Sequence, residues 1–186
     1  MNTWHLQFND NTPGGWLATL LYGVVIPLCW NAFAQRKAAE PGYAGLSRRF
    51  WFSFSLAVTG LGINKQLDLQ TLFSQVAHVM FIRVGMSEYL RFVEFIVGIM
   101  TIAVGAMVAL YLCIIAEQAH STERFVILAA LALLAFSVFR FASFNHLPIP
   151  FMGRHRPSLL VEIAVLTFLS VAVWCVSDSY ETGTHA

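Results

Sequence analysis

Charged residues are scarce in this sequence. Only 11% of its 186 residues are Asp, Glu, Lys or Arg, against about a quarter in an ordinary soluble domain. Eleven basic residues nearly balance ten acidic ones, so no net positive field exists to hold DNA or RNA, and nucleic acid is excluded as a partner. The hydrophobic fraction is 58% and the mean hydropathy is +0.66. A soluble domain of this length could not bury so much apolar surface, which indicates a membrane protein.

Cysteine and catalytic motifs are also lacking. The three cysteines, Cys29, Cys113 and Cys175, have no Cys-x-x-Cys spacing, so they predict neither a disulfide framework nor a zinc site. The sequence has no His-Glu-x-x-His, Gly-x-Ser-x-Gly or phosphate-cradling glycine motif. We therefore expect the cysteines to be small apolar packing residues and expect no metal site.

Long apolar runs are what the sequence has in abundance. A chain segment in lipid must satisfy its own backbone hydrogen bonds, which a helix does, and about 20 residues cross the hydrocarbon core. The runs predict one all-α domain over residues 1–186, an integral membrane bundle of five transmembrane helices plus one interfacial amphipathic helix. The expected spans are residues 14–34, 50–66, 92–116, 125–143 and 159–176, with the interfacial helix over about 69–84.

The basic residues favour one orientation. Four of them, Arg36, Lys37, Arg48 and Arg49, lie in the loop between the first two spans, which is the densest basic cluster of the chain. Cytoplasmic loops are enriched in Lys and Arg. We therefore expect the N-terminus outside and the C-terminus in the cytoplasm.

The second span carries the main functional signal. From Phe50 to Asn64 it would be about 22 Å long as a helix, too short to cross unaided. The polar segment that follows, residues 64–70, is therefore forced to the membrane boundary. A Lys and an Asp at that depth are costly unless they are paired or reach water, so they are expected to be functional.

Connectivity brings further polar side chains of the other spans to the same level. The predicted polar network or binding site consists of Asn64, Lys65, Gln66, Asp68, Gln70, Glu94, Arg140, Ser143, Asn145, His146 and Glu162. The opposite half of the bundle is expected to hold almost no charge.

Several segments resemble an uncharacterised family of small bacterial polytopic membrane proteins. They are Phe50-Trp51, the block Asn64-Lys65-Gln66-Leu67-Asp68-Leu69-Gln70, Tyr89-x-Arg91 and Arg140-x-x-Ser143-Phe144-x-His146, within residues 50–162. The resemblance implies the inner membrane of a bacterium and brings no activity with it. Where the family often has paired histidines, this chain has Asn145 before His146, which argues against a two-histidine metal site.

The favoured interpretation is structural: the chain is an accessory or scaffold subunit of a larger membrane assembly, in contact with membrane lipids and other integral membrane proteins. The polar cluster would then be an internal network that locks the bundle. It predicts that Lys65 pairs with Asp68, that Arg140 pairs with Glu94 or Glu162, and that no cavity is present.

The alternative is an intramembrane enzyme or a protein that binds a lipid or small molecule. Asp68, Glu94 or Glu162 would act as a base and His146 as an acid or base, and Ser143 beside His146 could be a nucleophile. Lys65 or Arg140 would hold an anionic headgroup. The residue types suffice for this chemistry, but their spacing does not require it.

No cofactor other than lipid is predicted. A third interpretation makes His78, His146 or His155 a ligand of haem or a pigment, but each is isolated in the sequence. A lone imidazole at a membrane boundary more often serves as a hydrogen-bonding anchor.

Overall fold

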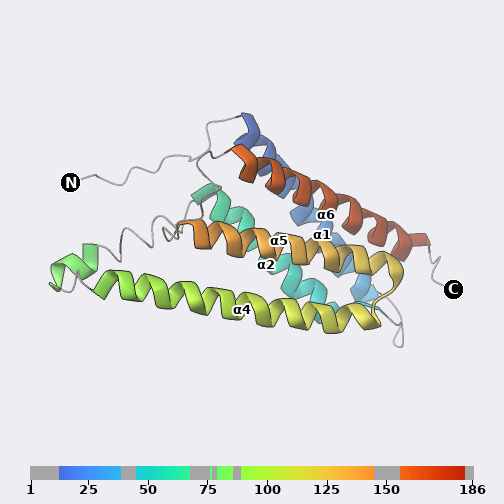
Figure 1. Cartoon of the computed structure of the whole chain (residues 1–186). Coiled ribbons are helices and arrows are strands. Elements are labelled where there is room, and N and C mark those ends of the chain that lie inside the picture. Colours follow the sequence, from blue (N-terminus) through green and yellow to red (C-terminus); the bar gives the residue numbers. More distant parts are fainter. Residues whose placement is uncertain are drawn as a thin grey trace.

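The computed structural model describes residues 13–38, 45–67, 76, 79–85, 89–144 and 156–182. These residues form helices and connections, with no strand among them, which confirms the all-α class. The long helices are α1 (Pro13–Ala38), α2 (Arg48–Leu67), α4 (Leu90–Gln118), α5 (Ser121–Phe144) and α6 (Arg156–Thr182) (Figure 1).

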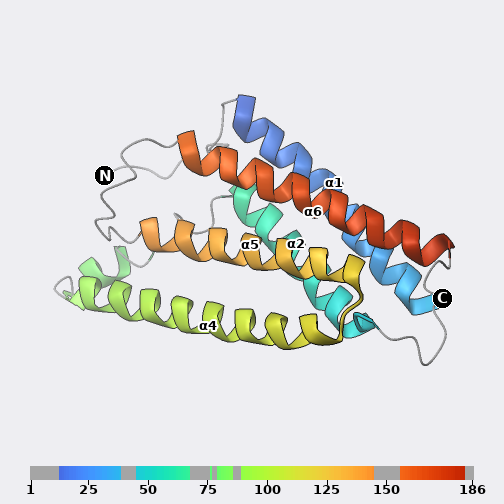
Figure 2. The same ribbon diagram turned by 45° about the vertical axis from the view of Figure 1, so that its right-hand side comes forward.

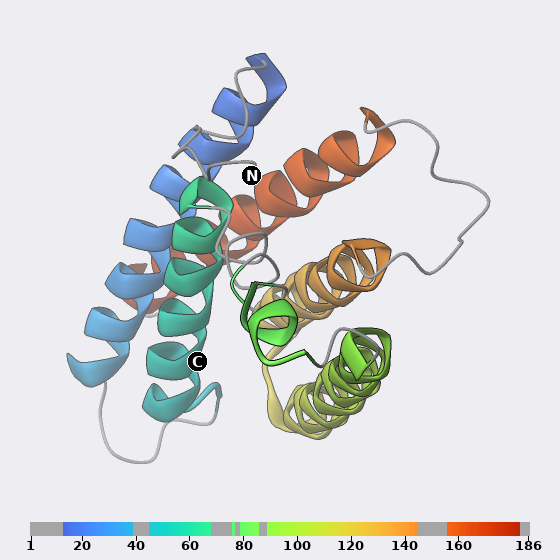
Figure 3. The same cartoon turned by 90° about the vertical axis from the view of Figure 1, so that its left-hand side faces the viewer.

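The helices form a bundle in which successive long helices run in opposite directions (Figures 1 and 2). The closely packed pairs are α1 with α2, α1 with α6, α5 with α6 and α4 with α5. Figure 3 accordingly shows α1 and α2 on one side of the bundle, α4 and α5 on the other, and α6 between them. We call the end where α1, α4 and α6 begin the Glu162 end, and the opposite end the Glu123 end.

Four of these helices are long and apolar enough to cross a membrane. Their membrane-spanning segments are Pro13–Arg36, Phe95–Gln118, Ser121–Arg140 and Leu159–Tyr180. Large apolar side chains such as Leu20, Met107, Leu110 and Leu160 are exposed on the outside of the bundle, where lipid tails would solvate them. These features are those of a membrane protein.

The fifth predicted span corresponds to α2, which does not meet the same criterion of length and hydropathy. The reason is that α2 contains polar side chains, two of which form hydrogen bonds with α1. Trp30 Nε1 donates to Thr59 Oγ1 at 3.3 Å, and Gln66 Nε2 donates to Thr19 Oγ1 at 2.7 Å. Membrane helices use such interhelical hydrogen bonds to associate, so α2 is held by polar contacts as well as by apolar packing.

The contact between α4 and α5 uses small residues, as lipid-embedded helices commonly do. Gly105 is buried, and a Cβ atom there would lie 2.8 Å from Val138 Cγ2. The sequence placed residues 117–124 in a loop and began the next span at Phe125. That boundary is wrong: α4 extends to Gln118 and α5 begins at Ser121, so only Ala119 and His120 connect them.

The predicted interfacial helix over 69–84 is described in part. Residues 76 and 79–83 are helical, and Val79, Met80 and Ile82 are exposed. Residues 68–75 and 77–78 lie outside the described part of the chain.

Candidate functional site

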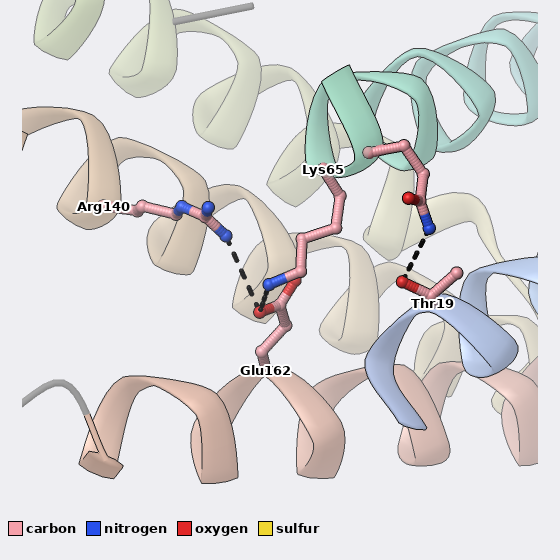
Figure 4. Close-up of polar contacts among 5 residues, drawn as sticks. Thr19, Lys65, Arg140 and Glu162 are labelled. Carbon is pink, nitrogen blue, oxygen red and sulfur yellow. Dashed lines mark hydrogen bonds and ion pairs between the residues drawn. The ribbon is translucent and has the colours of Figure 1, made fainter. Parts of the chain in front are cut away.

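Three charged side chains from three helices meet at the Glu162 end. Lys65 Nζ of α2 donates to Glu162 Oε2 of α6 at 3.1 Å, and Arg140 Nη1 of α5 lies 3.7 Å from the same oxygen (Figure 4). The side chains of Lys65 and Glu162 are only 6% and 3% exposed, whereas that of Arg140 is 31% exposed. One carboxylate oxygen is therefore shared by two cations of unequal exposure.

The same three side chains line a cavity of about 290 Å³. Its walls come from α1, α2, α4, α5 and α6. The apolar part of the wall is Leu61, Val104, Gly105, Val108, Leu134, Phe136 and Val138, and the polar part adds Tyr22, Asn64, Thr101 and Ser137 to the charged residues. The cavity thus has apolar walls and a charged cluster at the level where α2 and α5 end.

The cavity separates α2 from α4. Both helices line it, and within the described residues α2 and α4 are not among the closely packed helix pairs. The absence of a cavity, which the structural interpretation predicted, is therefore wrong. In the α1–α2 pair α1 packs on α6, and in the α4–α5 pair α5 packs on α6. Space therefore remains between α2 and α4.

The predicted site residues fall into three groups. Lys65, Arg140, Glu162 and Asn64 come together at the cavity, and Gln66 lies beside them but bonds to Thr19 of α1. Glu94 lies in α4 and Ser143 in α5, but their side chains lie outside the described part. Asp68, Gln70, Asn145 and His146 are outside the described residues altogether.

The ion pairs differ from the predicted set in one respect. Arg140 contacts Glu162, as one of its two predicted pairings required. Lys65 also contacts Glu162, a pairing between residues far apart in the sequence that helical spacing could not indicate. Its pairing with Asp68 stays a prediction.

A second buried carboxylate, Glu123, lies at the opposite end of the bundle. Glu123 is 0% exposed and accepts three hydrogen bonds. The donors are the backbone N–H of Leu46 (2.9 Å), the backbone N–H of His120 (3.3 Å) and the Tyr180 hydroxyl (2.5 Å).

Neighbouring groups extend this network over α1 and α2. Trp51 Nε1 donates to the Tyr180 hydroxyl at 3.3 Å, and Arg36 Nε donates to the Leu46 carbonyl at 2.9 Å. The Glu123 network therefore joins the connection before α2, the start of α5 and the end of α6. The expectation that this half of the bundle holds almost no charge is wrong.

The sequence held a signal for this site. Glu123 is the third residue of α5, and it bonds to the backbone N–H of His120, which directly precedes the helix. This is the Glu half of a capping box, recognisable as a Glu shortly after a helix start. The predicted start of this span at residue 125 leaves Glu123 outside the helix, and therefore hides the signal.

The metal and haem interpretations concern residues that the structure describes only in part. No group of three His, Cys, Asp or Glu side chains there could hold a metal ion. His78, His146 and His155, the predicted haem or pigment ligands, lie outside the described residues.

Comparison with protein-family models, with curated proteins and with solved structures gives no match.

Proposed function

We propose that this chain is a membrane-embedded protein that binds a lipid-like amphipathic molecule in the cavity between α2, α4 and α5. The observation that carries the proposal is the position of Lys65, Arg140 and Glu162 on the wall of an otherwise largely apolar cavity. A network that serves only to lock the bundle has no need of such a space, because close packing would stabilise it better.

The polarity of the cavity follows that of a bilayer. Its charged residues lie near helix ends, at the last residue of the α5 membrane segment and in the last turn of α2. Its apolar walls extend from there along α4 and α5. A molecule with a polar head and an apolar tail, oriented as membrane lipids are, would match both parts.

The size of the cavity limits what it encloses. Ligand pockets usually measure about 300–1,000 Å³, so 290 Å³ is small. We expect a head group and the first part of one chain to be enclosed, with the rest of the molecule in the surrounding bilayer.

The proposal is tested by mass spectrometry of the protein purified in a mild detergent. The wild type should retain a lipid, and Val104→Trp, which places an indole in the cavity wall, should lose most of it. Met107→Trp is the matched control, because Met107 is on the same helix, is 71% exposed and does not line the cavity. Equal retention by both variants would contradict a site in this cavity.

A role as a subunit of a larger assembly is the second candidate, and α4 favours it. Only 11% of the α4 membrane segment is buried in the bundle, against 28–33% for the other three. A helix of another membrane protein could cover it. Stoichiometric partner proteins in the same purification would support this role, whereas a stable lone bundle with lipid would favour the binding function alone.

We further propose that α2 crosses the membrane as a fifth span, in a bacterial inner membrane with the N-terminus outside. Its antiparallel packing on α1 (Figure 2) supports the crossing. The basic residues at the end of α1 and the start of α2 support the orientation. The resemblance of residues 64–70 to a bacterial family supports the location.

A further inference from the structure

Two polar side chains of the cavity wall form no hydrogen bond within the described part of the chain. They are Tyr22 of α1 and Asn64 of α2. Tyr22 is only 6% exposed, so its hydroxyl is largely removed from solvent. A buried polar group without a partner is unfavourable, and in native proteins most such groups are satisfied. These two side chains therefore indicate a ligand that supplies the partner.

The packing of Tyr22 fixes where its hydroxyl lies. A Cβ atom at Gly62 of α2 would lie 3.4 Å from Tyr22 Cδ1, so the lack of a side chain there lets the ring pack directly on α2. The hydroxyl interacts electrostatically with Glu162 and Arg140 without a hydrogen bond to either. It therefore lies beside the charged cluster, and Asn64 is at the same level because it directly precedes Lys65.

The other uncharged polar side chains in this region donate their protons within the protein. Gln66 donates to Thr19 of α1 (Figure 4), and Thr101 and Ser137 each donate to a backbone carbonyl of their own helix. What the cavity wall lacks is therefore an acceptor for the Tyr22 O–H and the Asn64 amide N–H. The amide also has an acceptor oxygen, but an unused carbonyl oxygen is tolerated more readily than an unused N–H.

We infer that Tyr22 and Asn64 donate hydrogen bonds to the ester carbonyl of an acyl lipid, so that the cavity prefers ester-linked over ether-linked lipids. The inference rests on the proposed binding function and adds the class of ligand and the residues that recognise it. An ester carbonyl joins the polar head of a lipid to its apolar chain, and these two side chains lie beside the charged cluster in a cavity whose other walls are largely apolar. The carbonyl oxygen has two lone pairs and no charge, so the net charge of the head group does not enter this recognition.

The test measures binding of two short-chain lipids to the full chain in a neutral detergent. The probes are diacyl and dialkyl phosphatidylglycerol, which share the head group and the chain length and differ in the ester or ether linkage. Hydrogen bonds to one carbonyl correspond to about tenfold in affinity, so the wild type should bind the diacyl lipid about tenfold more tightly. Tyr22→Phe and Asn64→Leu should each reduce this preference to about threefold, and the double variant should abolish it. Binding of the dialkyl lipid should be the same in all of these proteins.

Two controls separate recognition of the lipid from a structural role of the hydroxyl. Tyr111→Phe removes the hydroxyl of a tyrosine that is 57% exposed and does not line the cavity, and it should keep the preference of the wild type. In thermal unfolding without lipid, Tyr22→Phe should not lower the unfolding temperature, because its hydroxyl has no hydrogen bond to lose. Gln66→Leu, which breaks the bond to Thr19, should lower it. If Asn64→Leu does not fold, Tyr22→Phe decides the outcome alone.

Each contrary result has a distinct meaning. Equal binding of the diacyl and dialkyl lipids by the wild type, with both lost in Val104→Trp, would overturn the preference for an ester and leave the binding function standing. Lipid binding that Val104→Trp does not change would overturn both. A preference for the diacyl lipid that persists undiminished in Tyr22→Phe would overturn the assignment of the carbonyl to this hydroxyl.

Discussion

Two buried carboxylates, Glu162 and Glu123, differ in the groups that contact them, and this difference indicates different roles. Glu162 contacts two cations beside a cavity. Glu123 accepts from two backbone N–H groups and a hydroxyl, whose positions are fixed by the chain. These partners fit the proposal that Glu162 belongs to a binding site, and they indicate that Glu123 stabilises the fold.

The stabilising role of Glu123 is tested by Glu123→Ala. This change leaves three donors without their acceptor. A buried polar group left unsatisfied costs about 1–3 kcal/mol, so the free energy of unfolding should fall by about 3 kcal/mol or more. Unfolding in detergent, followed by circular dichroism, measures it. Glu123→Gln keeps one acceptor oxygen and should recover part of the loss.

Glu117→Ala is the matched control for that measurement, since Glu117 is an exposed acidic residue at the end of α4. It should change the stability by less than about 0.5 kcal/mol. A loss in Glu117→Ala as large as in Glu123→Ala would mean that the buried network is not the cause.

At the scale of the helices, the sequence was sufficient to predict the four helices that are long and apolar enough to cross a membrane, but not all of their ends. Apolar length fixes where a segment must be helical, and this placed α1 and α6 well. It does not fix where a helix stops in polar residues, because capping decides that, as at His120 and Glu123. The sequence also does not determine how each helix is rotated about its own axis. The contact of Lys65 with Glu162 could therefore not be predicted.

The helix contact through Gly105 gives a prediction at this scale. Gly105→Leu should separate α4 from α5, because even a Cβ atom there lies 2.8 Å from Val138 Cγ2. Overpacking of this kind costs about 1–3 kcal/mol. Gly23→Leu is the control, since nothing lies within 4 Å of a Cβ atom at that position; both variants gain helix propensity, so their difference in unfolding free energy isolates the contact. No difference between them would show that α4 does not need this close approach.

At the scale of the whole molecule, the alternation of helix direction decides which charged groups share one side of the membrane. The sequence predicted this grouping for Lys65, Arg140 and Glu162 from connectivity alone, and they meet at one end. What connectivity could not predict is the space beside them, because a cavity depends on how neighbouring hairpins pack.

The crossing of α2 is tested with single thiols in a chain whose three native cysteines are replaced. Arg49→Cys and Leu67→Cys place exposed positions at the two ends of α2. A membrane-impermeant maleimide should reach position 49 only from the cytoplasmic side and position 67 only from the other side. Labelling of both from one side would show that α2 does not span the membrane.

The connection of only Ala119 and His120 between α4 and α5 also bears on how the protein is made. So short a link does not allow one helix to be embedded in lipid while the other remains in water. The two helices must therefore enter the bilayer together as one helical hairpin, with the bond from the His120 N–H to Glu123 at its tip.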